Sequence, residues 1–161
     1  MEIELSKQRG TPPLRRRARL LAVLRLAQRC AGLGQCPGCL HLVIATSATM
    51  TRLNEDFLGH QGLTDVLTFD LRTEEPAIED DPEACAAEIY VSPDYAASVC
   101  RSFGNSCSRE LVLYMVHGML HLAGEDDLED APRQAMRAAE TRVLTELERH
   151  YSLEGFLDTP Q

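Results

Sequence analysis

The sequence predicts an α+β protein in which a mixed sheet of about four strands packs with about five helices. Three observations support this fold class. Short apolar or alternating segments typical of strands occur along the chain, and amphipathic segments of helical period lie between and after them. The 161 residues are also enough for one domain with its own core. We therefore expect residues 1–161 to form a single domain.

Four segments are expected to form strands because β-branched and other apolar residues are concentrated in them. They are residues 2–6, 40–45, 66–71 and 88–92. Residues 72–87 are rich in Asp and Glu and contain two prolines. This composition predicts a solvated loop between the last two strands.

Five segments are expected to form helices. The first opens at Thr11-Pro12-Pro13, because Thr can cap a helix and Pro is tolerated in its first turn, and it ends near Gly32. Ser47 is expected to cap the second helix, which runs to about Phe57. The remaining helices are expected at residues 93–103, 108–123 and 131–150.

The helix expected over residues 108–123 carries the candidate chemistry. It is apolar almost all round, which predicts a central, buried helix. His117 and His121 interrupt this pattern four residues apart, so both imidazoles project from one face and can bind one metal ion. Gly124 allows a sharp turn, after which Glu125-Asp126-Asp127 can supply a carboxylate as the third ligand. Such a set leaves one position open for water, as catalytic zinc sites do.

Two alternatives accompany this hypothesis. Histidines four apart also occur by chance, and core histidines often bond to backbone carbonyls, while an acidic turn is often only a solvated loop. Zinc proteases of the His-Glu-x-x-His type use the Glu after the first His as a general base. That position is Gly118 here, so proteolysis by this mechanism is disfavoured.

The segment His117-Gly-Met-Leu-His121-Leu-Ala-Gly124-Glu-Asp126-Asp127 resembles the signature His-Gly-x-Leu-His-Leu-x-Gly-x-Asp-His of the YbeY family of bacterial metal-dependent endoribonucleases. Leu53-Asn54, Thr64-Asp65-Val66-Leu67-Thr68-Phe69 and Glu88-Ile89-Tyr-Val-Ser92 are similar to other segments of that family. The resemblance extends from about Leu40 to Arg149. It implies that residues 1–161 form a single metal-dependent hydrolase domain of YbeY type.

The resemblance also implies site residues and partners. His117, His121 and Asp127 would bind one divalent metal ion, expected to be zinc, with Asp126 or Glu125 as candidate proton acceptors. Asn54 would contact substrate or only satisfy amides of a turn. Arg52 is a further candidate for substrate binding, because it can compensate for an Arg that the family has at position 58. The implied substrate is single-stranded RNA, in particular ribosomal RNA during maturation and quality control, with the ribosome or small-subunit proteins as partners and no DNA.

Two positions depart from the family pattern. Asp127 stands where the family has its third histidine, so the site gains a negative charge and can favour another divalent metal. Leu58 stands where the family usually has an Arg that helps to hold RNA. Another metallohydrolase on this scaffold, and a non-catalytic ribosome-assembly factor with a structural metal, therefore stay open as alternatives.

Composition gives further expectations. The net charge of −9 is uneven, because residues 1–52 hold nine Lys or Arg against two acidic residues. The first helix carries six arginines that either contact RNA phosphates or form a solvated face: Arg15, Arg16, Arg17, Arg19, Arg25 and Arg29.

The segment Cys36-Pro-Gly-Cys39 is interpreted as a turn with incidental cysteines. The alternatives are half of a zinc site and a redox pair. No secretory signal or apolar membrane-length run is visible, so a cytoplasmic location without membrane partners is expected.

Overall fold

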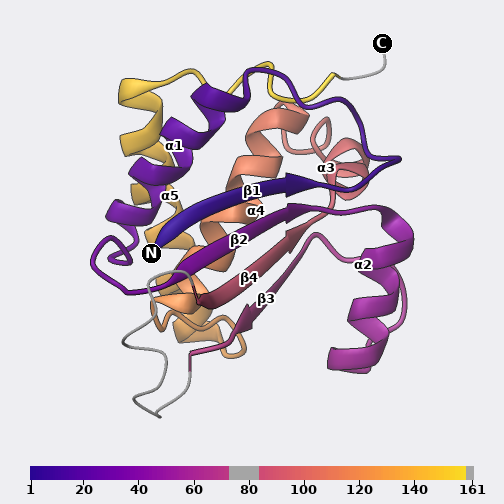
Figure 1. Cartoon of the computed structure of the whole chain (residues 1–161), viewed down its shortest axis with the longest axis horizontal. Coiled ribbons are helices and arrows are strands. Elements are labelled where there is room, and N and C mark those ends of the chain that lie inside the picture. Colours follow the sequence, from indigo (N-terminus) through magenta and orange to yellow (C-terminus); the bar gives the residue numbers. More distant parts are fainter. Residues whose placement is uncertain (73–83, 159–161) are drawn as a thin grey trace.

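The computed structural model describes residues 1–72 and 84–158 (Figure 1). Its strands are β1 (Glu2–Lys7), β2 (Cys39–Ile44), β3 (Val66–Asp70) and β4 (Cys85–Val91). Its helices are α1 (Arg17–Cys30), α2 (Ser47–Leu53), α3 (Pro93–Val99), α4 (Cys107–Leu122) and α5 (Asp130–His150), with a π-helical turn η1 (Asn54–Leu58) after α2. These elements confirm the predicted α+β class. Most of the predicted acidic loop lies outside the described residues.

The sheet has the strand order β1-β2-β4-β3 and is mixed. β1 pairs with β2, and β2 with β4, in parallel, whereas β3 pairs with β4 in antiparallel orientation. β1 and β3 therefore form the two opposite edges of the sheet. β3 at one edge is the strand that borders the candidate site.

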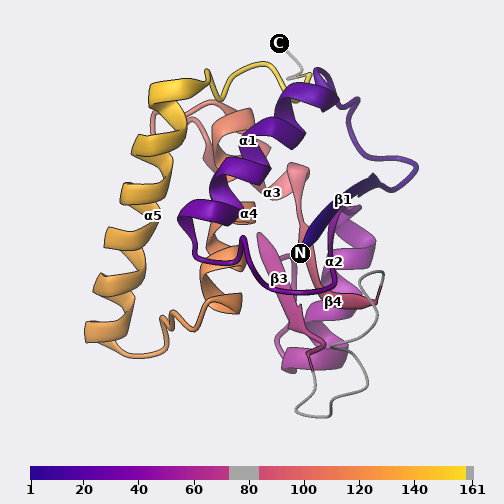
Figure 2. The same ribbon diagram turned by 60° about the vertical axis from the view of Figure 1, so that its left-hand side comes forward.

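The helices cover the two faces of the sheet unequally (Figure 2). α1 and α4 pack on one face and α5 packs outside them, against both. This side encloses the main core, whose largest fully buried side chains include Leu20, Leu24, Leu111 and Phe156. A smaller core of Ala45, Met50 and Leu67 lies where α2 meets β3. The described helices contain no segment long and apolar enough to cross a membrane.

The first helix begins later than the sequence predicts. Thr11 does not cap it; its hydroxyl donates to the carbonyl of Gln8, and α1 starts only at Arg17. The preceding residues pair with the end of the chain instead, through an antiparallel bridge between Leu14 and Leu157. Arg16 has a φ of 51°, a left-handed conformation that keeps this segment out of the helix.

The second helix also differs at its ends. Thr46, not Ser47, caps it, because the Thr46 hydroxyl accepts from the backbone N–H of Thr49. The helix then widens into the π-helical turn η1, a feature that is often found at functional sites. This turn brings Leu58 to the rim of the cleft described below.

Gly118 lets α4 approach the sheet closely. A Cβ at this position would lie 2.7 Å from Thr68 Oγ1 and 2.9 Å from Ile89 Cγ2. The Glu that zinc proteases place here would therefore collide with β3 and β4. Close packing of α4 on the sheet thus explains why residue 118 is a glycine. The same glycine leaves the chain without the Glu that zinc proteases use as a base.

Candidate metal centre

The two histidines lie side by side near the end of α4. His117 and His121 have ring centroids 4.5 Å apart, and their Nε2 atoms are 2.9 Å apart. The N-cap Ser106 and the apolar residues around the helix fix α4 in the core, so this face is held against β3. The predicted one-turn spacing of the histidines thus places both Nε2 atoms at one point.

The chain returns to these histidines through a tight turn. Gly124 has a φ of 97°, which glycine adopts without strain, and it ends the helix as the sequence predicts. Asp127 then lies with Oδ1 3.6 Å from His121 Nε2 and Oδ2 3.7 Å from His117 Nε2. The ligand atoms of these three residues all lie within 4.8 Å of one another.

The opposite ring nitrogen of each histidine is held by an acceptor. His117 Nδ1 is 2.6 Å from Glu140 Oε1, and His121 Nδ1 is 3.0 Å from the carbonyl oxygen of Glu125. A carbonyl can only accept, so His121 carries its proton on Nδ1, and the Glu140 carboxylate favours the same arrangement in His117. Both Nε2 lone pairs then face the same point, as they do in metal-binding histidines.

Two facing lone pairs 2.9 Å apart repel unless a proton or a metal ion lies between them. In the absence of metal the centre favours the proton. Burial would lower the pKa of His117, but the hydrogen bond and charge of Glu140, together with Asp127 and Asp65, outweigh it and raise this pKa. Two imidazoles and a carboxylate are a donor set that divalent zinc accepts, so these residues could hold such an ion.

The other two acidic residues of the turn have different surroundings. Asp126 is exposed, and its Oδ1 accepts from the backbone N–H groups of Asp127 and Leu128 at 2.7 and 3.2 Å. Its side chain lines the cleft beside the centre. Glu125 contributes its backbone carbonyl to His121. Of the two proposed proton acceptors, only Asp126 is among the residues that line this cleft.

A cleft of about 440 Å³ opens beside the centre, between β3, the end of α4 and η1. The β3 residues from Val66 to Asp70 line it. Leu58 and Leu128 line its rim and are 54% and 81% exposed. Phe57, next to Leu58, packs edge-on against Phe69 at 5.1 Å. The cleft therefore has a metal-binding group at one end and an apolar rim.

The two residues proposed to bind substrate, Asn54 and Arg52, lie away from the cavities at the centre. Asn54 is buried, and its side-chain amide donates to the carbonyl of Gly62 at 3.0 Å. Arg52 is exposed on α2, and neither residue is among those that line the cavities at the centre.

The basic helix α1 contacts β1, at the opposite edge of the sheet from β3. The Thr64 hydroxyl donates a hydrogen bond to Asp65 Oδ1, and this oxygen also accepts from the backbone N–H of Val66.

Two features of the centre were not predicted from the sequence: the contact of Glu140 with His117, and a second cavity beside these residues. Glu140 lies 23 residues after His117, and it reaches the imidazole only because α5 packs on α4. A second cavity of about 210 Å³ lies on this side and includes His117, Asp127 and Glu140. The hydroxyl of Tyr114, which also lines it, has no partner among the described residues. No local pattern in the sequence pairs Glu140 with His117, because this contact depends on the packing of α5 on α4.

Comparison with known proteins identifies the family of the chain. The model of the family "Endoribonuclease YbeY" matches residues 7–148. The Endoribonuclease YbeY of Salinibacter ruber is 41% identical over 106 residues, which are 65% of this chain and 68% of that protein. For the Endoribonuclease YbeY of Desulfitobacterium hafniense the identity is 37% over 109 residues, with coverages of 66% and 69%. The solution structure of TM1509 from Thermotoga maritima superposes with a TM-score of 0.59 at 26% identity, over 95% of each chain. The chain belongs to the YbeY family of endoribonucleases.

Proposed function

We propose that this chain is a metal-dependent endoribonuclease that cleaves single-stranded RNA and acts in the maturation and quality control of ribosomal RNA. In this proposal His117, His121 and Asp127 bind one zinc ion. Membership of an endoribonuclease family supports RNA as the substrate. Ribosomal RNA and the ribosome as partners, and the cytoplasm as the place of action, follow from the same family resemblance.

One observation carries the proposed metal dependence. The Nε2 atoms of His117 and His121 face each other at 2.9 Å, and both oxygens of Asp127 lie 3.6–3.7 Å from them. The Nδ1 atoms are both occupied by acceptors, so neither imidazole can relieve this contact by exchanging its tautomer. A bound cation satisfies all three donors at once.

A divalent metal ion held there would supply a Lewis acid for a phosphoryl oxygen and would lower the pKa of water. The chain itself contributes orientation and proton transfer. Glu140 and the Glu125 carbonyl fix the two imidazoles. Asp126 is the proposed proton acceptor, because it lines the cleft and its Oδ2 has no hydrogen-bond partner among the described residues.

The apolar rim of the cleft suits unpaired bases better than a duplex. Phe57 is 64% exposed and lies beside Leu58 and Phe69. Unstacked bases of single-stranded RNA bind to exposed aromatic rings largely independently of sequence. With Leu58 in place of the usual Arg, base stacking rather than a phosphate contact would hold the RNA at this rim.

The test is cleavage of a labelled single-stranded RNA by the purified chain, before and after removal of metal by a chelator. We expect cleavage to stop and to return with zinc. Asp127→Ala should remove cleavage and the metal bound between His117 and His121. Asp130→Ala is the matched control, because Asp130 lies three residues further on and is 94% exposed. Cleavage that survives both chelation and Asp127→Ala would contradict the proposal. Full metal binding without any cleavage would favour a non-catalytic assembly factor.

A further inference from the structure

A second group of metal-ligating side chains lies on the outer face of the sheet, on the side away from α1 and α4. Three neighbouring strands contribute to it. Its members are Glu4 of β1, Cys39 and His41 of β2, and Cys85 and Glu88 of β4. We call these five residues the sheet-face cluster. It contains two thiols, one imidazole and two carboxylates, and it shares no residue with the centre on α4.

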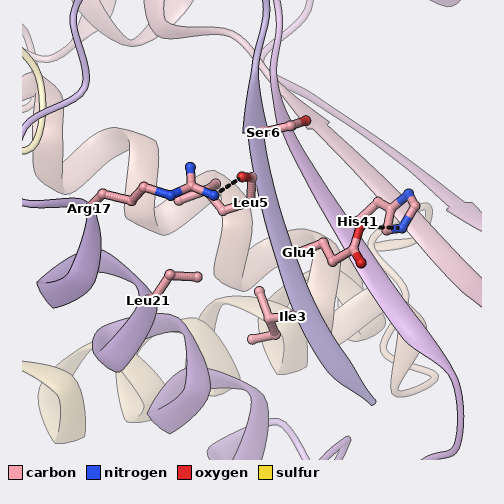
Figure 3. Close-up of a pocket in the computed structure, with 7 residues that line it drawn as sticks. All are labelled: Ile3, Glu4, Leu5, Ser6, Arg17, Leu21 and His41. Carbon is pink, nitrogen blue, oxygen red and sulfur yellow. Dashed lines mark hydrogen bonds and ion pairs between the residues drawn. The ribbon is translucent and has the colours of Figure 1, made fainter. Parts of the chain in front are cut away.

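The first half of the cluster joins β1 and β2. The ligand atoms of Glu4, Cys39 and His41 all lie within 4.8 Å of one another, and Glu4 Oε2 is 3.0 Å from His41 Nε2. Figure 3 shows Glu4 and His41 turned toward each other on one side of β1, whereas Leu21 and Arg17 lie on the other side. A thiol, an imidazole and a carboxylate thus converge at the edge of the sheet.

The second half joins β2 and β4. The ligand atoms of His41, Cys85 and Glu88 also lie within 4.8 Å of one another, and Glu88 Oε1 is 4.0 Å from His41 Nδ1. The hydroxyl of Tyr90 donates to the other oxygen of Glu88 at 3.0 Å, which fixes this carboxylate with Oε1 toward the cluster. His41 therefore lies between two carboxylates and two thiols.

A β-bulge makes this arrangement possible. Side chains three positions apart on a regular strand point to opposite faces, so Cys85 and Glu88 should not meet. The register of β2 and β4 shifts between Cys39 and Leu40, and one residue of β4, Ala86, is left without a partner. The extra residue returns Cys85 to the face of Glu88, an effect that is typical of bulges beside functional sites. Cys39 and Cys85 are thereby direct partners in the register.

We propose that the sheet-face cluster binds one zinc-like ion through His41 and the thiolate and carboxylate of one half, either Cys39 with Glu4 or Cys85 with Glu88. Thiolate and imidazole ligands select zinc over harder ions such as magnesium. Both halves of the cluster use the same imidazole, so they compete for a single ion. Each thiol gives its proton to solvent on binding. The half that binds the ion links two neighbouring strands, β1 with β2 or β2 with β4.

The test is titration of the reduced, metal-free full chain with Co²⁺, whose near-ultraviolet spectrum gains an intense band only when thiolates bind it. We expect this band to saturate at one ion per chain. A Cys39→Ser/Cys85→Ser variant should lose it, and His41→Gln should weaken binding at least tenfold. Cys36→Ser is the matched control, because Cys36 is the other thiol of the same turn and is not in the cluster. His117→Ala should leave the band intact, which separates this site from the centre on α4.

Three results would overturn the proposal. They are the absence of a thiolate band in the unmodified chain, a band that survives loss of both Cys39 and Cys85, and a band lost in Cys36→Ser. Circular dichroism of each metal-free variant guards against misfolding. If the double variant does not fold, substitution of the partly exposed His41 replaces it as the test: unchanged affinity in His41→Gln would also refute the proposed ligand set.

Discussion

Replacing Glu140 by Gln should weaken zinc binding at the centre on α4 about tenfold and leave the fold intact. Glu140 Oε1 lies 2.6 Å from His117 Nδ1, and the two side chains are only 18% and 20% exposed. Gln keeps an oxygen that can accept from Nδ1 but loses the negative charge. A hydrogen bond to a charged group contributes about 1.5–3 kcal/mol and a neutral one about 0.5–1.5 kcal/mol. The difference of about 1–1.5 kcal/mol corresponds to roughly a tenfold change in affinity.

The assay is competition for zinc against a chromophoric chelator, in a Cys39→Ser/Cys85→Ser background so that thiols do not contribute. Glu146→Gln is the matched control, since Glu146 lies on the same helix and pairs only with Arg149 and His150 among the described residues. If Glu140→Gln binds zinc as tightly as the control while His117→Ala does not bind it, Glu140 does not orient the imidazole and the reasoning fails.

The same contacts give three further predictions. The raised pKa of His117 in the metal-free chain gives stability that is complete below its unfolded value of about 6.5 and is lost as pH rises through the folded pKa. In urea unfolding with chelator present, the free energy of unfolding should therefore fall from about pH 6.5 upward, and it should fall less in Glu140→Gln. If Glu140→Gln keeps the unmodified pH profile, Glu140 is not the cause of the raised pKa of His117. Leu58→Arg should add one phosphate contact and steepen the slope of log affinity for single-stranded RNA against log salt by about 0.7. The control Phe103→Arg, at another exposed apolar residue that precedes the opposite end of α4, should not change this slope. Equal slopes in the two variants would show that residue 58 does not contact the RNA. Gly118→Ala should place a Cβ 2.7 Å from Thr68 Oγ1 and lower stability by about 1–2 kcal/mol, since overpacking outweighs the better helix propensity of Ala. The midpoint of thermal unfolding should fall by roughly 3–6 °C. An unchanged midpoint would show that the neighbouring side chains move aside at no cost.

The local parts of the centre could be predicted from the sequence because they depend on short-range geometry. The spacing of His117 and His121 fixes their common face, and Gly124 fixes the turn that follows. Glu140 could not be predicted, since its contact with His117 depends on how α5 packs on α4. Proximity in the sequence was also misleading for Glu125, which supplies its backbone carbonyl to His121.

The fold shows the same division between local and tertiary determinants. The four strands and five helices follow from periodicity, so the class and order of elements could be predicted. The start of α1 could not, because residues 14 and 157 meet only in the folded chain. The pairing of Cys39 with Cys85 depends on a bulge that no local pattern announces, and Cys36 was the more obvious partner in the sequence.

The most direct test of the proposed metal centre is the position of zinc in crystals of the zinc-loaded chain, located by anomalous scattering at the zinc edge. We expect a peak bound by His117 Nε2, His121 Nε2 and an oxygen of Asp127, each at about 2.0–2.2 Å. A peak bound instead by the carboxylate of Glu125 or Asp126, or no peak between the two histidines, would contradict the proposed ligand set.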